Sequence, residues 1–65
     1  MSERIIRNVA KCRLCGDVIE SKKLYDVQTC RCGEISVEGG KNYIGRFAST
    51  NWNNIIDLSE YEEDV

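Results

Sequence analysis

Four cysteines arranged in two short repeats constrain this chain more than any other feature. Cys12 and Cys15 lie in KCRLCGDVI, and Cys30 and Cys32 lie in TCRCGEI. The second repeat matches the first except that one residue between its cysteines is missing. A chain of 65 residues buries too little apolar surface to be stable without disulfides, a metal or a partner. The cysteines are therefore the expected source of its stability.

The spacing of the two cysteine pairs is typical of a zinc site. Four thiolates at about 2.3 Å from one Zn²⁺ lie about 3.8 Å apart, whereas residues on one side of a strand are about 6–7 Å apart. The backbone must therefore turn at each pair, and Gly16 and Gly33 follow the pairs where such a turn needs glycine. We predict two hairpin tips that together hold one structural Zn²⁺ through Cys12, Cys15, Cys30 and Cys32. Iron is the possible substitute, because four thiolates accept both metals.

The alternatives are disulfides or unligated thiols. Four cysteines allow three pairings, and a bridge between Cys30 and Cys32 would be strained. A metal with four protein ligands has no open position at which to activate water. The chain has no histidine and therefore no imidazole base. We find no catalytic pair and predict that the protein is not an enzyme.

The remaining pattern predicts short strands at residues 4–12, 17–21 and 24–30. A hairpin is predicted around Gly39-Gly40, which permit positive φ at both central positions of a tight turn. A two-residue turn would pair Ile35 with Ile44 and Ser36 with Tyr43. A three-residue loop would instead pair Val37 with Tyr43, and the sequence does not choose between them.

The C-terminal residues have a different pattern. Trp52, Ile55 and Ile56 have helical spacing, which predicts a short helix capped by Ser49 or Thr50 and packed on the sheet. We therefore predict a small β-rich zinc domain, zinc-ribbon-like, with two Cys clips on hairpin tips and a short C-terminal helix. Its boundaries are residues 1–58 for the single four-cysteine domain and 59–65 for an acidic C-terminal tail.

Charge and hydropathy narrow the function further. The net charge is −2, which argues against direct nucleic-acid binding. No signal peptide or apolar run of membrane-spanning length is visible, so we expect a cytoplasmic protein in a compartment that keeps thiols reduced.

Two groups of residues are candidates for binding a partner. The first group is aromatic or basic, and its members either pack in the core or form a contact platform: Tyr25, Tyr43, Arg46 and Phe47. The second group is acidic and is either solvated, disordered tail or a contact for a basic surface: Glu60, Glu62, Glu63 and Asp64. Asp57, Glu34 and Glu38 are further acids that could meet such a surface, and Asp17 is expected at a turn. No oligomeric state is predicted.

Residues 12–46 resemble a family of very short proteins encoded by phages and mobile elements of Gram-positive bacteria. The family pattern is C-x2-C-G-D-x-I-E-S, then C-x-C-G-x-I-x-V-D-G-G, then Tyr and Arg. The matching positions are Cys12, Cys15, Gly16, Asp17, Ile19, Glu20, Ser21, Cys30, Cys32, Gly33, Ile35, Val37, Gly39, Gly40, Tyr43 and Arg46. Glu38 replaces the family's Asp, and the long acidic end departs from the pattern.

Some small metal-binding phage proteins of this size are similar to anti-CRISPR inhibitors, which bind the RNA-guided nuclease of type II systems. The resemblance therefore implies a non-catalytic protein that inhibits a host nucleic-acid enzyme, such as a CRISPR effector, in the cytoplasm of a bacterial host cell. The alternatives are a nucleic-acid-binding zinc module and a rubredoxin-like electron carrier. The C-x-C clip argues against the carrier, because rubredoxins have C-x2-C at both clips.

Overall fold

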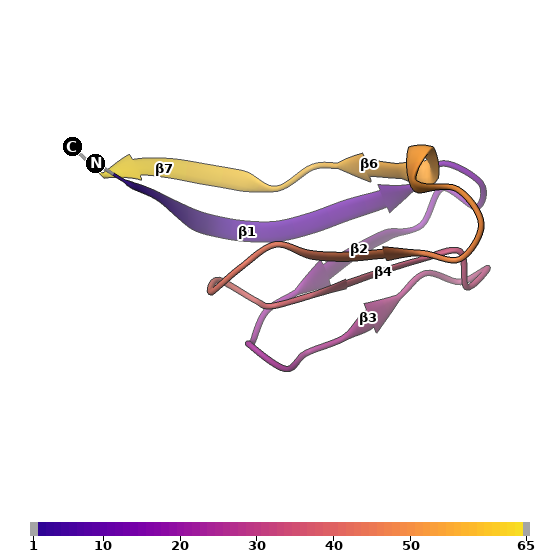
Figure 1. The fold of residues 1–65 in the computed structure, drawn as a ribbon, viewed down its shortest axis with the longest axis horizontal. Helices are drawn as coiled ribbons and strands as arrows, with labels where there is room; N and C mark the ends of the chain where they lie inside the picture. The colour runs from indigo at the N-terminus through magenta and orange to yellow at the C-terminus, as the bar shows by residue number, and fades with distance from the viewer. Residues whose placement is uncertain (1, 65) are drawn as a thin grey trace.

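The chain folds into two antiparallel sheets that pack on each other (Figure 1). The computed structural model describes the backbone of residues 2–64 and the side chains of residues 4–63. In the first sheet β1 is central, with β2 on one side and β6 and then β7 on the other. Its strands are β1 (Ser2–Cys12), β2 (Val18–Ser21), β6 (Ile55–Asp57) and β7 (Glu60–Asp64). The β-rich, zinc-ribbon-like fold class is confirmed.

The second sheet has the order β3-β4-β5. Its strands are β3 (Gln28–Thr29), β4 (Ile35–Glu38) and β5 (Gly45–Ala48). The strand predicted over residues 24–30 is reduced to the two residues of β3, because residues 22–26 form a turn in which Asp26 Oδ2 accepts from the amide of Lys22 at 3.0 Å. The strands predicted over residues 4–12 and 17–21 correspond to β1 and β2.

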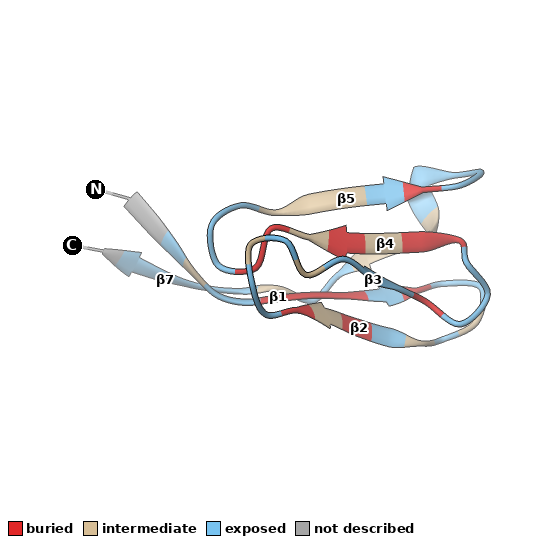
Figure 2. Ribbon diagram, turned by 90° about the horizontal axis from the view of Figure 1, so that it is seen from below, coloured by how far each residue is buried: buried red, intermediate tan, exposed pale blue. Residues whose placement is uncertain are grey.

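The core lies between the two sheets and consists of small and aliphatic side chains (Figure 2). Along β4, Ile35 and Val37 are buried, whereas Ser36 and Glu38 are only half-buried, which is the alternation of a strand with one covered face. The buried apolar residues are Val9, Ala10, Cys12, Ile19, Cys30, Ile35, Val37 and Ala48. Two of these are cysteines, so the core and the cysteine cluster are one unit.

None of the five aromatic residues belongs to this core. Their exposed fractions range from 42% for Tyr61 to 87% for Tyr25. The interpretation of Tyr43 and Phe47 as core residues is therefore wrong, because strand alternation places Phe47 on the outer face of β5 while its neighbours Arg46 and Ala48 pair with the inward residues of β4.

The predicted hairpin around Gly39-Gly40 is present, but both predicted registers are wrong. Ile35 pairs with Ala48 and Glu38 with Gly45, so the connection is a loop of residues 39–44. Gly39 and Gly40 do adopt positive φ, 100° and 53°. They are not the two central residues of the turn, however, because the amide of Asn42 donates to Gly39 O at 2.9 Å, which centres the turn on Gly40 and Lys41.

The predicted C-terminal helix is wrong as well. Only the 3-10 turn η1 (Trp52–Asn54) forms, capped by Asn51 Oδ1, which accepts from the amide of Asn53 at 2.8 Å. The next residues, Ile55–Asp57, pair with β1 as strand β6. Two consecutive β-branched residues favour a strand. The edge of β1 supplies backbone hydrogen-bond partners that a strand can use and a helix cannot. Within residues 2–64 no helix is long and apolar enough to cross a membrane.

The acidic end forms a strand, so its interpretation as a disordered tail is wrong, although Glu60, Glu62 and Glu63 remain exposed to solvent. β7 pairs with the first residues of β1, which brings the two ends of the described chain together (Figure 1). Glu62 forms an ion pair with Arg4, and Glu60 pairs with Arg7 at 3.2 Å. The side chain of Asp64 lies outside the described residues.

Trp52→Ala should change the free energy of unfolding by less than about 0.5 kcal/mol, the usual range for exposed sites. The indole is 60% exposed, so truncation opens no cavity, although its helical spacing suggested a buried residue. Ile35→Ala, at a fully buried site, is the matched positive control and should cost about 2–5 kcal/mol. Urea denaturation measures both, and a large loss for Trp52→Ala would contradict its exposed position.

Candidate metal centre

The first cysteine pair lies on the turn between β1 and β2. Cys12 is the last residue of β1, and its amide donates to Asp17 O at 2.9 Å. Inside this turn the amide of Gly16 donates to Cys12 O at 2.9 Å, with φ of 75° at Gly16. The chain therefore reverses within five residues, which turns the Cys12 and Cys15 side chains toward one point.

The second pair lies on the turn that leads into β4. This turn has the same length as the first, although one residue between its cysteines is missing. The amide of Cys30 donates to Ile35 O at 3.0 Å, so the closing bond again joins a cysteine to the fifth residue after it. The inner bond is shorter in sequence, from the Gly33 amide to Cys30 O at 3.0 Å. The second tip closes at Ile35, one residue past the acid that follows the glycine, whereas the first tip closes at the acid itself, Asp17. The deletion therefore changes the ligand spacing but not the length of the tip.

The two tips bring the four sulfur atoms into one cluster. All four Sγ atoms lie within 4.8 Å of one another, and Cys32 Sγ lies 3.6 Å from both Cys12 Sγ and Cys30 Sγ. These separations are close to the roughly 3.8 Å expected around a tetrahedral metal–thiolate centre. All four cysteines are free thiols, so the disulfide alternative is not what the fold adopts.

Backbone amides around the cluster favour thiolates. The Cys15 amide lies 3.5 Å from Cys12 Sγ, and the Ile35 amide lies 3.4 Å from Cys30 Sγ. The amide of Asp17 lowers the pKa of Cys15 to about 6. At Cys32 the amide of Glu34 acts in the same direction, but burial and the three neighbouring thiols outweigh it and raise the pKa to about 12.

A divalent cation at the centre of the cluster would stabilise the charged form of all four cysteines. Four thiolates within 4.8 Å repel one another, and a bound divalent ion reverses that balance and holds them deprotonated. The cluster thus offers four convergent soft ligands, which fits a metal ion. With all four positions taken by protein sulfur, the site suits structural stabilisation rather than activation of water.

Two acids that follow the cysteine pairs support the cluster from outside. Asp17 Oδ2, from the first tip, accepts from the amide of Arg31 in the second tip at 3.0 Å and so links the two. Glu34 is buried and Oε2 accepts from the side chain of Asn54 at 2.9 Å and from Thr50 Oγ1 at 2.7 Å, as well as from two backbone amides. These bonds, led by Asn54, lower the pKa of Glu34 to about 2.

The charge of Glu34 suggested contact with a partner. Its carboxylate is instead buried and occupied by hydrogen bonds within the chain. It organises residues 50–54, because its carboxylate is the common acceptor for their donors. Little in the sequence indicates this role, since the donors lie 16–20 residues away.

Glu34→Ala should lower the melting temperature clearly, because the donors of Thr50, Asn51 and Asn54 lose their buried acceptor. Glu63→Ala removes the same charge at an exposed site and should leave the melt unchanged. Differential scanning calorimetry of the two metal-loaded variants makes the comparison. Equal melting temperatures would show that the Glu34 carboxylate is not what holds residues 50–54.

Arg46 is not a surface residue for a partner, which corrects the prediction from sequence. Its side chain is only 11% exposed. The guanidinium donates to Asn8 Oδ1 at 2.6 Å, to Val9 O at 3.2 Å and to Asp57 Oδ1 at 2.9 Å. Arg46 thus joins β5 to β1 and β6 across the two sheets.

Asn8 is the residue that the sequence analysis missed. It is fully buried, and its side-chain amide donates to the carbonyl oxygens of Glu38, Gly40 and Tyr43 at 2.8, 2.9 and 3.1 Å. These three carbonyls belong to the 38–43 connection, so Asn8 fixes the wide loop described above. A signal did exist, because Asn8 is in phase with the inward-facing Ala10 and Cys12.

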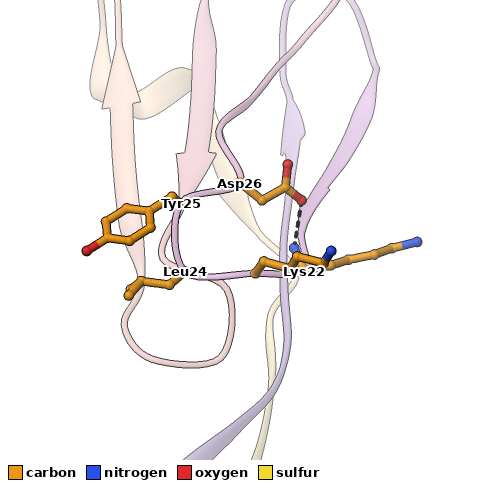
Figure 3. A pocket seen from close by; sticks show the side chains of 5 residues that line it. Lys22, Leu24, Tyr25 and Asp26 are labelled. Carbon is orange, nitrogen blue, oxygen red and sulfur yellow. Dashed lines mark hydrogen bonds between the residues drawn. The ribbon is translucent and has the colours of Figure 1, made fainter.

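Three of the predicted partner-binding residues lie exposed at or near the second sheet. Phe47 and Tyr43 are 57% and 45% exposed, and the Tyr43 hydroxyl donates to Glu38 Oε2 at 2.7 Å. Tyr25 lies on the 22–26 turn beside Leu24, at a surface hollow of about 620 Å³ (Figure 3).

The chain belongs to the protein family described as Domain of unknown function (DUF7695), which it matches over residues 4–48. The match includes both cysteine tips, Asn8 and Arg46, and it ends with the last residue of β5. No curated protein and no solved structure matches the chain.

Proposed function

We propose that this protein is a non-catalytic binding module that one Zn²⁺ ion stabilises and that recognises a protein partner through the outer face of the β3-β4-β5 sheet. The observation that carries the proposal is the position of the aromatic residues. A chain that is short of core would gain most by burying them, yet all five are exposed. Exposed apolar side chains that gather on a surface mark interaction sites.

The outer sheet face has the composition of an interface. Phe47 and the Tyr43 ring stand on the same side of β5, where Tyr43 lies against Gly45. Across the strands, Ser36 pairs with Phe47 and its hydroxyl lies 2.9 Å from Thr29 Oγ1. Aromatic anchors beside hydroxyl groups combine apolar contact area with hydrogen-bonding capacity.

The choice of zinc rests on the ligand chemistry. Four thiolates in a compact cluster are typical of structural zinc, and iron is the other metal that such a set accepts. Elemental analysis of protein purified without added metal should find one zinc per chain. A red protein whose iron cycles between two redox states would instead favour the electron-carrier alternative.

Direct nucleic-acid binding, the other alternative, finds little support in the charge distribution. Arg4 and Arg7 are paired with acids of β7, and Arg46 is occupied inside the fold. A protein partner is therefore the better candidate. The finer expectation, inhibition of a host nucleic-acid enzyme such as a type II CRISPR effector in the bacterial cytoplasm, rests on the resemblance in sequence.

Phe47→Ser tests the proposed face, with Leu58→Ser as the matched control. Both remove an exposed apolar side chain, 57% and 43% exposed, but Leu58 follows β6 in the other sheet. Captured host proteins are identified by mass spectrometry with wild type as bait, and Phe47→Ser should lose a partner that Leu58→Ser retains. Identical capture by all three proteins would contradict the proposed face.

The target class is tested separately, by adding the purified protein to a type II effector loaded with guide RNA. A decrease in DNA cleavage that depends on protein concentration is the expected result. Unchanged cleavage would rule out that effector as the target, while the capture experiment would still report on the binding face.

A further inference from the structure

The N-terminal half of β1 has a neighbouring strand on only one side. β2 pairs with β1 from Asn8 to Lys11. The β6–β7 segment runs along the other side, where the Leu58 amide donates to Val9 O at 3.0 Å and β7 pairs with residues 2–7. In the described part of the chain, no strand continues the line of β2 along residues 2–7. Figure 2 shows β1 and β7 leaving the body there as a two-stranded ribbon.

A groove runs along this open edge. One section, of about 300 Å³, is lined by residues 6–8 of β1, residues 20–22 at the end of β2, and Lys41. A second section, of about 420 Å³, is lined by residues 4–6, Lys41 and Asn42. The two sections share Ile6 and Lys41, so together they form one groove between the ribbon and the 39–44 loop.

The groove is positively charged. Its lining holds four cations, Arg4, Arg7, Lys22 and Lys41, and one acid, Glu20, but Arg4 is paired with Glu62 and Arg7 also with Glu60, so the excess positive charge comes from the two lysines. Glu20 is neutralised by Arg7 at 3.2 Å, and the hydrogen bond from Arg7 lowers the pKa of its carboxyl group. Among the described side chains no acid lies within ion-pair distance of Lys22 or Lys41. These two ammonium groups are available to an incoming acid.

We infer that this groove binds an extended acidic segment of a protein partner, which adds to the sheet as a strand in line with β2. Main-chain hydrogen bonds to the open edge supply affinity, and alternate side chains supply specificity. Glutamate or aspartate side chains meet Lys22 and Lys41, and an apolar side chain between them meets Ile6, which is 38% exposed. The inference rests on the proposed function in that the ligand is a protein.

A second copy of the chain suits this edge less well. The same unpaired ammonium groups, Lys22 and Lys41, line this edge in every copy, so two copies that pair here bring like charges into one groove, which destabilises the pairing. The charge of the edge therefore favours an acidic partner over self-association.

The test uses the full-length zinc-loaded protein, labelled with ¹⁵N, and a synthetic eight-residue peptide in which glutamate alternates with valine. Titration should shift the backbone amide signals of residues 4–7 and of Lys41. A peptide with lysine in place of glutamate controls for charge. A glutamate peptide that is N-methylated at every residue controls for strand pairing, because it keeps the charge but has no backbone N–H to donate to the ladder on either edge. Neither control should bind.

Charge reversal at Lys22 and Lys41 provides the test on the protein side. Because surface charge pairs are individually weak, the double variant Lys22→Glu, Lys41→Glu should raise the dissociation constant of the acidic peptide about tenfold. Lys11→Glu changes the same type of exposed charge near the cysteines and should leave the dissociation constant unchanged. Higher salt should weaken wild-type binding more than that of the double variant.

Several results would overturn the inference. They are absence of binding, equal binding of the N-methylated peptide, and shifts confined to Phe47 and Tyr43. Shifts at residues 4–7 that depend on protein concentration without any peptide would identify a second copy as the occupant instead. Failure here leaves the capture experiment with Phe47→Ser intact, so the two proposals fail separately.

Discussion

Cys12→Ser and Cys30→Ser should each leave the chain largely unfolded at 25 °C. Both cysteines are buried and belong to the core cluster, so a metal bound by them would stabilise the same unit as the apolar core. A structural zinc ion contributes about 10–16 kcal/mol of apparent binding free energy. A core of this size rarely supplies more than about 3–5 kcal/mol. The loss of one thiolate therefore removes more stability than the rest of the fold provides.

Circular dichroism and the dispersion of ¹H–¹⁵N NMR spectra report the loss of fold. Leu14→Ser is the matched control, because Leu14 lies in the same tip but is 62% exposed. A strong chelator should unfold the wild type, and zinc should restore the spectrum. A cooperative melt of Cys12→Ser near the wild-type temperature would contradict the idea that the metal holds the fold together.

Asn8→Ala should reduce the free energy of unfolding by about 3–4 kcal/mol. The buried amide donates to three loop carbonyls and accepts from Arg46. A buried polar group that loses its partner costs about 1–3 kcal/mol, and several groups are stranded at once. Asn42→Ala, at an exposed position in the same loop, is the control and should have little effect.

Asn8→Asp separates hydrogen bonding from side-chain volume. The carboxylate keeps the shape and can still accept from Arg46, but it has no hydrogen to donate and places an oxygen against three carbonyl oxygens. We therefore expect Asn8→Asp to be destabilised as well, despite its matched volume. Chemical denaturation of both metal-loaded variants measures these losses. A stable Asn8→Asp would mean that the amide merely fills space.

The sequence was sufficient to predict the cysteine cluster and the fold class. Spacing alone required a backbone turn at each cysteine pair, and both turns are present with glycine at positive φ. Such predictions succeed because ligand spacing and turn chemistry are local. The strands at β1 and β2 were predictable for the same reason, since short stretches of β-branched and alternating residues determine them.

The tertiary structure alone decided the features that depend on distant partners. The register of β4 and β5 follows from Asn8, which lies 30 residues or more from the carbonyls that it binds. The 49–56 segment has helical spacing, but the open edge of β1 and the buried carboxylate of Glu34 turn it into a 3-10 turn and a strand.

The same applies to the surface. Arg46 and Phe47 are neighbours in a motif that suggested one contact platform, yet strand alternation buries the first between the sheets and exposes the second. The acidic end, which by composition resembles a solvated tail, is a strand because β1 extends beyond β6 and offers it an edge. Composition and spacing thus determined the cysteine cluster. Long-range pairing determined which side chains remain on the surface to meet a partner, because burial depends on what the rest of the chain places opposite each residue.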